Sequence, residues 1–149
     1  MSFYKRRYRD RDFAGPPEEL ERKLAESTTV YVGNLSFYVE ESQIYAFFSI
    51  FGPIKSVIMG LNRNTKTPCG FCFVVFYRRC HAESAASYIS AMMLNNRLLT
   101  VDIDAGFEEG RQYGRGNHGG QIQDERRTIF DEERGGYAKF VKRDSERPS

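Results

Sequence analysis

The sequence predicts an α+β fold, a ferredoxin-like sandwich whose elements alternate in the order βαββαβ. Three observations carry this prediction. Nearly all of the aliphatic periodicity lies in residues 28–104, strand-like and helix-like patterns alternate along that segment, and the flanking segments are rich in charged residues or glycine. We therefore predict a single domain at 28–104, a flexible N-terminal extension at 1–27 and a flexible C-terminal extension at 105–149.

The first half of this domain predicts a strand, a helix and a second strand. Residues 30–35 are rich in valine and break at Gly33-Asn34, which is typical of a strand that ends in a turn. Apolar side chains at positions 44, 47, 48 and 51 recur at the spacing of one helix face, and Gly52-Pro53 ends that helix. Residues 54–59 then predict the second strand.

The second half predicts a strand, a helix and a last strand. A polar turn at 62–68 leads into an aromatic and β-branched run at 71–77, which predicts the third strand. Small side chains at positions 82, 85 and 86, with isoleucine at 89, mark one face of the second helix. Asn95-Asn96 predicts a turn, and residues 98–103 predict the fourth strand.

Charge and hydropathy exclude several classes of protein. The formal net charge is +2, which divides as +1, +1 and 0 over the three segments, so no segment is a basic arm that binds phosphates through bulk charge. No apolar run approaches the length of a membrane span, and the N-terminal residues lack the apolar core of a secretory signal. Three cysteines without such a signal indicate reduced thiols in an intracellular protein.

Alternation within the strands places three aromatic rings together. In the third strand the even-numbered positions face the helices, so Phe71 and Phe73 stand on the open face of the sheet. The same argument places Tyr31 of the first strand beside them. Three exposed rings are unfavourable in a small domain, so something normally covers them. Strand alternation by itself favours nucleobases and protein equally as the cover of these rings, the protein being a partner or the chain's own tail.

The fourth strand places acids on the same open face. If Leu99, Val101 and Ile103 face the core, then Asp102 and Asp104 face outward. Carboxylates repel phosphates, but they accept hydrogen bonds from the donors of a guanine edge and favour a positively charged base. The alternative is that they are solvated acids at a strand end.

A cationic base would also account for the tyrosines. Electron-rich ring faces attract a delocalised positive charge by about 0.5–2 kcal/mol per contact. Tyr31 supplies one ring, and the N-terminal arm offers a second from Tyr4, Tyr8 or Phe13.

Two motifs point to nucleic acid. Residues 69–76, CGFCFVVF, resemble the octapeptide of the RNA recognition motif family, with Cys69 in place of its basic residue and Cys72 in place of its Gly/Ala. Residues 30–35, VYVGNL, resemble the companion hexapeptide, which here starts 39 residues earlier. This resemblance implies that bases stack on the rings of the open face.

Over residues 8–139 the chain resembles the family of small subunits of nuclear cap-binding complexes. Its segments outside the generic domain are the most diagnostic. The matching stretches are YVGNLSFY at 31–38, IMGL at 58–61, CGFCFV at 69–74, DAGF at 104–107, EGRQYGRG at 109–116 and RGGY at 134–137.

The resemblance implies a 7-methylguanosine cap held between Tyr8 and Tyr31. Two acids, Asp102 and Asp104, would take the base edge, and two arginines, Arg111 and Arg115, would hold the triphosphate. Further along the tail, a glutamine and an isoleucine would complete the pocket where it holds the ribose and phosphates of the cap. The implied cap-binding residues are Tyr8, Tyr31, Thr100, Val101, Asp102, Ile103, Asp104, Arg111, Gln112, Tyr113, Gly114, Arg115, Gln121 and Ile122, with Phe71 and Phe73 supporting the pocket.

The resemblance also implies the partners and the setting. These are capped RNA, a much larger helical subunit that makes cap binding tight, no membrane, and tails that order on the ligand. The implied location is the nucleus with shuttling to the cytoplasm, in support of mRNA processing, splicing, export and surveillance. No catalytic residue, cofactor or metal ion is expected. Cys69 and Cys72 would point to opposite faces of their strand, so they could not share zinc.

Three departures from the family's pattern indicate a divergent copy. Thr100 stands where the family has an arginine, Ile103 where it has a tryptophan, and Gln123 where it has a basic residue. A lost charged contact to phosphate would cost about 1.5–3 kcal/mol.

Two alternative functions remain open at this point. One is a general binder of single-stranded RNA, and the other is a module that uses the open face for a protein. The run Arg134-Gly135-Gly136 resembles RGG-type RNA contacts, but such runs are too few here for a low-complexity RNA-binding tail.

Overall fold

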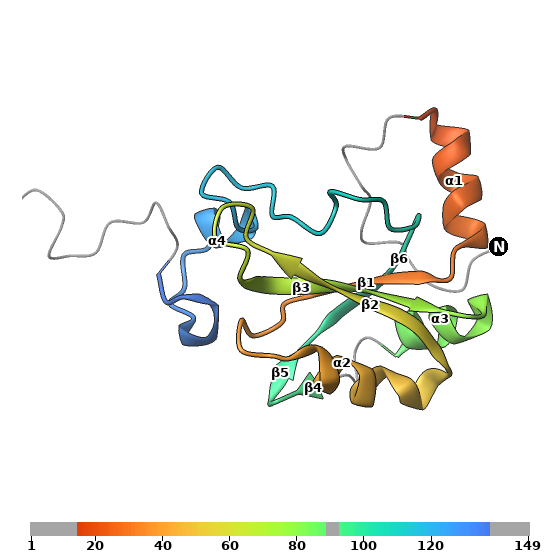
Figure 1. Ribbon diagram of the computed structural model, residues 1–149, viewed down its shortest axis with the longest axis horizontal. Helices are drawn as coiled ribbons and strands as arrows, with labels where there is room; N and C mark the ends of the chain where they lie inside the picture. Colours follow the sequence, from red (N-terminus) through yellow and green to blue (C-terminus); the bar gives the residue numbers. More distant parts are fainter. Residues whose placement is uncertain (1–14, 89–92, 138–149) are drawn as a thin grey trace, which may run out of the picture.

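The computed structural model describes residues 15–88 and 93–137. Its centre is an antiparallel sheet of β1 (Thr29–Gly33), β2 (Ile54–Leu61), β3 (Pro68–Phe76) and β6 (Thr100–Asp104), in the order β2-β3-β1-β6. Helices α2 (Glu41–Phe48) and α3 (Arg79–Ser87) lie on one face of this sheet (Figure 1). The predicted α+β fold and its βαββαβ order are confirmed.

Both helices follow the predicted faces. Helix α2 starts with a capping box between Glu40 and Gln43, buries Ile44 and Phe48, and continues into the 3₁₀ turn η1 (Ser49–Phe51) before Gly52. Helix α3 buries its three alanines, whose small side chains let the helix lie close to the sheet. The predicted position Ile89 lies outside the described residues.

The core lies between the helices and one face of the sheet. The strand residues predicted from alternation all face this core and are buried. They are Val30, Val32, Cys72, Val74, Phe76, Val101 and Ile103. Val57 of β2 lies in the core as well.

The predicted fourth strand is divided in two. Residues Arg97–Leu98 form β5, which pairs with β4 (Met93–Leu94), whereas β6 begins at Thr100 and pairs with β1. The chain changes its pairing partner at the buried Leu99. Asn95 and Asn96 have φ angles of 54° and 62°, as a two-residue hairpin turn requires, which confirms the predicted turn.

A helix that the sequence did not predict precedes the sheet. Helix α1 (Pro17–Glu26) starts at a proline, carries Glu18 and Glu19 in its first turn and buries Leu24. Only Leu20 and Leu24 of this helix pack against the core, which is too short an apolar pattern to predict a helix from periodicity. Within the described part of the chain no helix is long and apolar enough to cross a membrane.

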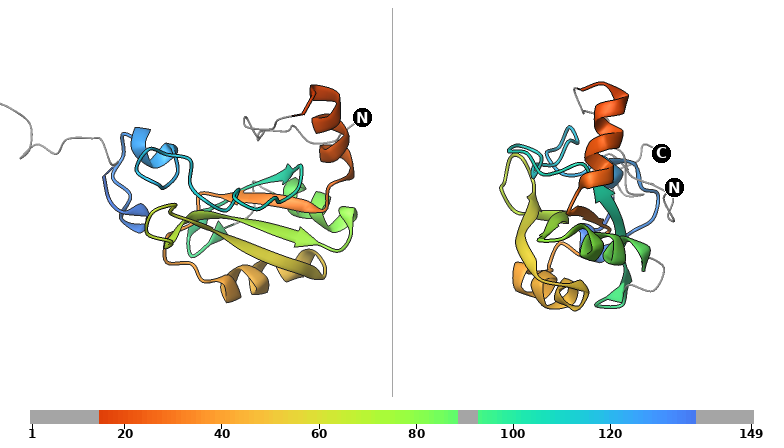
Figure 2. Two further views of the ribbon diagram at one scale, coloured as in Figure 1. Left: turned by 45° about the horizontal axis from the view of Figure 1, so that its top comes forward. Right: turned by 90° about the vertical axis from the view of Figure 1, so that its right-hand side faces the viewer.

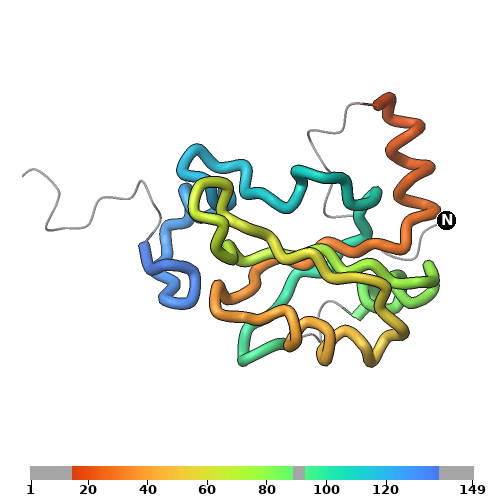
Figure 3. The backbone as a smooth tube through the Cα atoms, viewed as in Figure 1, coloured from red at the N-terminus to blue at the C-terminus, as the bar shows by residue number. Residues whose placement is uncertain are grey.

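The C-terminal segment crosses the sheet face that the helices leave open. Figures 2 and 3 show residues 105–137 running over that face and past the turn between β2 and β3. Leu61 donates its N–H to the carbonyl of Gln112 at 2.7 Å and accepts from Gly114 at 2.9 Å. Arg63 donates to the carbonyls of Gly114 and Gly116. The segment also contains α4 (Gln123–Arg126) and the turn η3 (Glu132–Arg134).

One glycine of β2 tests how tightly the open face is packed. A Cβ at Gly60 would lie 2.4 Å from the ring of Phe71, whose neighbours leave it little room to move. We expect Gly60→Ala to lower the free energy of unfolding by about 1–3 kcal/mol, measured by urea denaturation. Lys55→Ala, on an exposed position of the same strand, should change it by less than about 0.5 kcal/mol. Equal unfolding midpoints for the two variants would contradict this packing.

Candidate functional site

The candidate site is built on three aromatic rings from β1 and β3. The ring centroids of Tyr31 and Phe71 lie 5.8 Å apart with planes inclined by 28°, and Phe73 stands edge-on to both at 5.9 Å. Strand alternation places the rings here, as predicted, because each is one residue removed from a core position.

The chain's own C-terminal segment covers these rings. Phe107 packs against Phe73 with centroids 5.6 Å apart, and the guanidinium carbon of Arg111 lies 4.9 Å from the centre of the Phe73 ring. Phe71 and Phe73 are therefore only 5% and 2% exposed. Of the alternatives for what covers the rings, the structure favours the tail.

A cavity of about 210 Å³ remains between the sheet and this segment. The cavity unites most of the predicted residues, although they come from two strands and from a tail some forty to ninety residues further along the chain. Its lining consists of Tyr31, Phe71, Phe73, Arg111, Tyr113, Gly114, Arg115, Gln121, Ile122 and Gln123.

Tyr31 is held as a neutral phenol. Burial raises the pKa of its hydroxyl to about 12, against the opposing effects of a hydrogen bond from Gln121 and of the Arg134 charge. Gln121 donates through Nε2 to the hydroxyl oxygen at 2.7 Å. At neutral pH the cavity therefore presents an uncharged, electron-rich ring.

Asp104 differs from its expected role. Its side chain is fully buried, and both carboxylate oxygens accept from Arg111, at 2.6 and 2.7 Å. The backbone N–H of Gly106 donates to it as well, at 2.9 Å. The carboxylate lies behind Arg111 instead of facing the cavity, so the contact to a base edge that the family resemblance implied is not available in this arrangement.

The other predicted residues of β6 divide between the two faces. Val101 and Ile103 are buried in the core, so only their backbone can approach a ligand. Asp102 is half-buried and lies directly across from Tyr31 in the β1–β6 ladder, so the two side chains share a face. Thr100 is exposed and pairs with Gly33, next to the Tyr31 ring.

Residues 113–114 form the wall of the cavity beside β2. Gln112 does not line it, because its amide accepts from Gly110 and donates to Glu109. Tyr113 lines it from one side and carries the Lys66 ammonium 4.2 Å from its ring centre on the other. Gly114 lies so close to the backbone of Gly120 that a Cβ would approach it to 2.4 Å.

Arg134 is a site residue that sequence analysis missed. Its position in an Arg-Gly-Gly run resembled an exposed RNA contact, yet it is only 3% exposed. It donates to the carbonyls of Leu35 and Gly70, where the two motif segments meet, and to Asp124 and Gln121. No periodic pattern signals a buried arginine within a glycine-rich segment.

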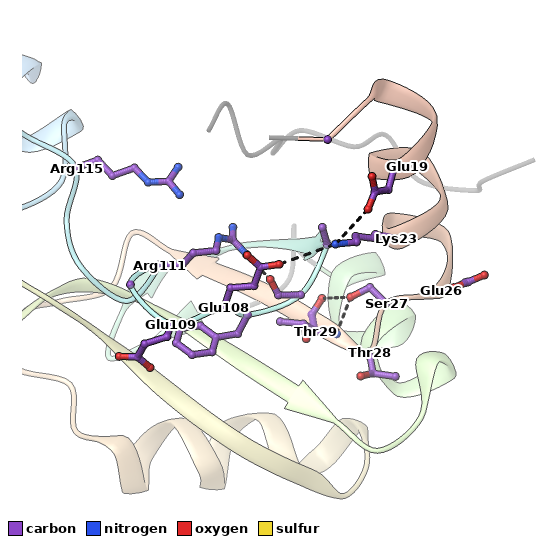
Figure 4. A pocket seen from close by; sticks show the side chains of 15 residues that line it. Glu19, Lys23, Glu26, Ser27, Thr28, Thr29, Glu108, Glu109, Arg111 and Arg115 are labelled. Atoms are coloured by element: carbon purple, nitrogen blue, oxygen red, sulfur yellow. Dashed lines mark hydrogen bonds and ion pairs between the residues drawn. The ribbon is translucent and has the colours of Figure 1, made fainter. Parts of the chain in front are cut away.

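A second, larger cavity of about 760 Å³ lies between α1 and residues 105–115. Figure 4 shows Arg111 and Arg115 extending toward it from the tail, with Lys23 of α1 on the opposite side. The same two arginines also line the smaller cavity, so the two cavities adjoin. The predicted residue Tyr8 lies outside the described residues, which begin at the rim of this cavity with Gly15.

The two strand cysteines lie on opposite sides of the sheet, as their spacing predicts. Cys69 packs with the aromatic rings and Cys72 lies in the core. Burial raises the pKa of the Cys69 thiol to about 12 and also raises that of Cys72. Among residues 15–88 and 93–137, no group of three potential metal ligands comes together.

Comparison with known proteins gives both a domain and a set of relatives. The model described as "RNA recognition motif" matches residues 30–100. "Nuclear cap-binding protein subunit 2" of Drosophila ananassae is 54% identical over 134 residues, which cover 90% of this chain and 87% of the relative. The protein of that name from Ixodes scapularis is 56% identical over 134 residues, covering 90% and 88%.

A plant relative and a solved structure complete the comparison. "Nuclear cap-binding protein subunit 2" of Oryza sativa subsp. japonica is 57% identical over 139 residues, covering 93% of this chain but only 57% of the plant protein. The chain thus spans little more than half the length of that relative. The structure "Rna15 RRM with bound RNA (GU)" aligns with a TM-score of 0.49 and 24% identity, over 56% of this chain and 89% of that chain.

The two acids of β6 should differ in their importance for stability. Asp104→Asn leaves the buried Arg111 guanidinium without its anion, so we expect the free energy of unfolding to fall by about 3–5 kcal/mol. Asp102→Asn, two residues earlier on the same face but half-buried, is the matched control and should cost much less. Urea denaturation measures both, and similar losses would refute the assignment of Asp104 to Arg111.

Proposed function

The chain belongs to the nuclear cap-binding protein subunit 2 family, and from this premise we propose that it binds the 7-methylguanosine cap of RNA in the cavity over Tyr31. It would do so as the small subunit of a nuclear cap-binding complex. The observation that carries the proposal is the lining of the 210 Å³ cavity, where a neutral tyrosine ring, two arginines and Gln121 come together over the motif strands.

Tyr31 would stack on the methylated base. The positive charge of 7-methylguanine favours an electron-rich ring, by about 0.5–2 kcal/mol for each cation–π contact. The second ring of the sandwich would come from Tyr8. Tyr8 lies seven positions before Gly15, and seven extended residue steps span about 23–25 Å, a reach that extends over the adjoining cavity.

In this proposal Asp102 binds the edge of the methylated guanine. Asp102 shares the face of Tyr31 across the β1–β6 ladder, and a carboxylate accepts hydrogen bonds from the guanine edge. Asp104 would act indirectly, by fixing the Arg111 guanidinium at the junction of the two cavities. This assigns the two acids different roles, one toward the ligand and one toward an arginine.

The triphosphate would lie along Arg111 and Arg115. Guanidinium groups match the geometry of phosphate oxygens, and both side chains border both cavities. From there the RNA chain would leave through the larger cavity, past Lys23 on α1. Gln121 and Ile122 would close the smaller cavity on its ribose and phosphate side.

A general binder of single-stranded RNA is less well supported. Bases could stack on Phe71 and Phe73 only after Phe107 and Arg111 had left the sheet, because these now cover the rings. A cavity of limited volume suits one base and its phosphates better than a continuous strand.

A large protein partner fits the opposite face of the molecule. Tyr45 on α2, Ile50 in η1 and Tyr88 after α3 are exposed on the side of the sheet away from the cavity. Such apolar side chains commonly mark a protein interface. In the proposed complex the larger subunit would occupy this side and capped transcripts would bind the other.

The proposed setting is the nucleus, with shuttling to the cytoplasm, and the proposed role is a binding one without catalysis.

Titration with cap analogues tests the proposed function. With the large subunit present, we expect 7-methyl-GTP to bind more tightly than GTP, measured by tyrosine fluorescence and calorimetry. Tyr31→Ala should weaken 7-methyl-GTP by about 5–150-fold, which corresponds to the loss of one stacked face. Tyr38→Ala is the matched control, because this tyrosine is exposed and lines neither cavity. Equal affinities for the two nucleotides would overturn the proposal.

Thr100 offers a gain-of-affinity test. It stands beside the Tyr31 ring where the family has an arginine. If the threonine weakens the site, Thr100→Arg should restore a charged contact and tighten 7-methyl-GTP by roughly tenfold or more in the same titration. Thr100→Gln, a long side chain without the charge, is the control. No gain would mean that another residue compensates for the missing arginine.

A further inference from the structure

We propose that Arg134 is a positioning residue for the ligand cavity. It orients the Gln121 amide so that the amide nitrogen donates to Tyr31. The inference deepens the proposed function, and its first test observes the Gln121 amide directly instead of the ligand affinity.

Every donor of the Arg134 guanidinium is in use. Nη1 donates to the carbonyls of Leu35 and Gly70 at 2.7 and 3.1 Å. Nε and Nη2 donate to the two oxygens of Asp124 at 3.0 and 2.7 Å, and Nη2 also donates to Oε1 of Gln121 at 2.8 Å. A guanidinium has five N–H donors, and here five hydrogen bonds hold it in a single orientation.

The chemistry of arginine fixes the direction of the next hydrogen bond. Arginine cannot accept, so the atom of Gln121 that faces Arg134 has to be the amide oxygen. The side chain of Gln123 donates to the same oxygen at 3.3 Å, which favours the same orientation. The amide nitrogen of Gln121 then points to Tyr31 and donates to its hydroxyl at 2.7 Å. Without Arg134, the amide could turn over at little cost.

The strands leave space for this arginine. Gly70 has a φ of +93°, and a Cβ there would lie 2.0 Å from Nη1 of Arg134. The Gly70 carbonyl accepts from both Leu35 and Arg134, so the guanidinium lies where the hexapeptide and the octapeptide meet. The tail is thereby tied to the two segments that carry the stacking rings.

Arg127 provides a natural control within the same network. It contacts the same carboxylate, that of Asp124, and donates to the carbonyls of Arg134 and Gly136 at 3.0 and 2.6 Å. Within the described part of the chain its hydrogen bonds go to these groups and not to Gln121, so it stabilises the tail without orienting the amide. Lysine has three donors on one atom. A lysine at either position therefore keeps the positive charge but loses the planar arrangement of donors on separate nitrogens that the guanidinium provides.

The first experiment is NMR of the Gln121 side-chain amide in the full chain saturated with 7-methyl-GTP, because the family resemblance implies tails that order on the ligand. In the wild type we expect slow hydrogen exchange of this amide, and Tyr31→Phe should shift its resonances because it removes only the acceptor oxygen. Arg134→Lys should bring exchange and shifts to solvent-like values, whereas Arg127→Lys should leave them unchanged. An unaltered amide in folded Arg134→Lys would overturn the inference. If that variant fails to fold, an amide insensitive to Tyr31→Phe would overturn it equally.

The second experiment separates positioning from stability through a double-mutant cycle on 7-methyl-GTP affinity. Arg134→Lys should weaken binding about tenfold in the wild-type background and less than about twofold in the Gln121→Ala background, because both changes remove the same contact. Equal losses in both backgrounds would show a purely structural role and overturn the inference. A wild type that fails to prefer 7-methyl-GTP over GTP would overturn the proposed function instead, and the amide experiment would still decide the role of Arg134.

Discussion

The structure depends on one constraint, which is that three large rings on one side of a small sheet have to be covered. Tyr31, Phe71 and Phe73 cannot turn inward, because each is adjacent in its strand to a residue that already fills the core. Rings of this size contribute much of the apolar area available to a domain of this length. The C-terminal segment provides the cover, with Phe107 on the rings and the chain held at the end of β2.

Covering a sheet with a polar, glycine-rich segment requires that its buried charges find partners. The tail meets this requirement with arginines that bind carboxylates and backbone carbonyls together. Arg111 binds Asp104 and the Gly106 carbonyl, and Arg134 binds Asp124 and both motif segments. A buried ion pair offsets its own desolvation only when its geometry is good and its remaining donors are satisfied. All five donors of Arg134 are used, and Arg111 binds both oxygens of its carboxylate.

In this arrangement, residues of both the domain and the tail form the candidate site. The domain supplies the stacking rings and the edge carboxylate of Asp102, and the tail supplies the arginines and Gln121. An isolated domain would keep the rings and lose the groups suited to phosphate. Recognition of a cap should therefore be sensitive to how firmly the tail is held, including at residues such as Arg134 that line neither cavity.

The sheet, the helix faces and the ring positions were predictable from the amino-acid sequence, because strand and helix periodicities are local and each residue's face follows from its neighbours. The hairpin turn at Asn95-Asn96 was equally local. The tertiary structure alone decided that Asp104 serves Arg111, that Arg134 is buried, and that α1 forms. These depend on residues brought together from distant parts of the chain, as Arg134 meets Leu35, and neither periodicity nor composition records which charged side chain will find its partner there.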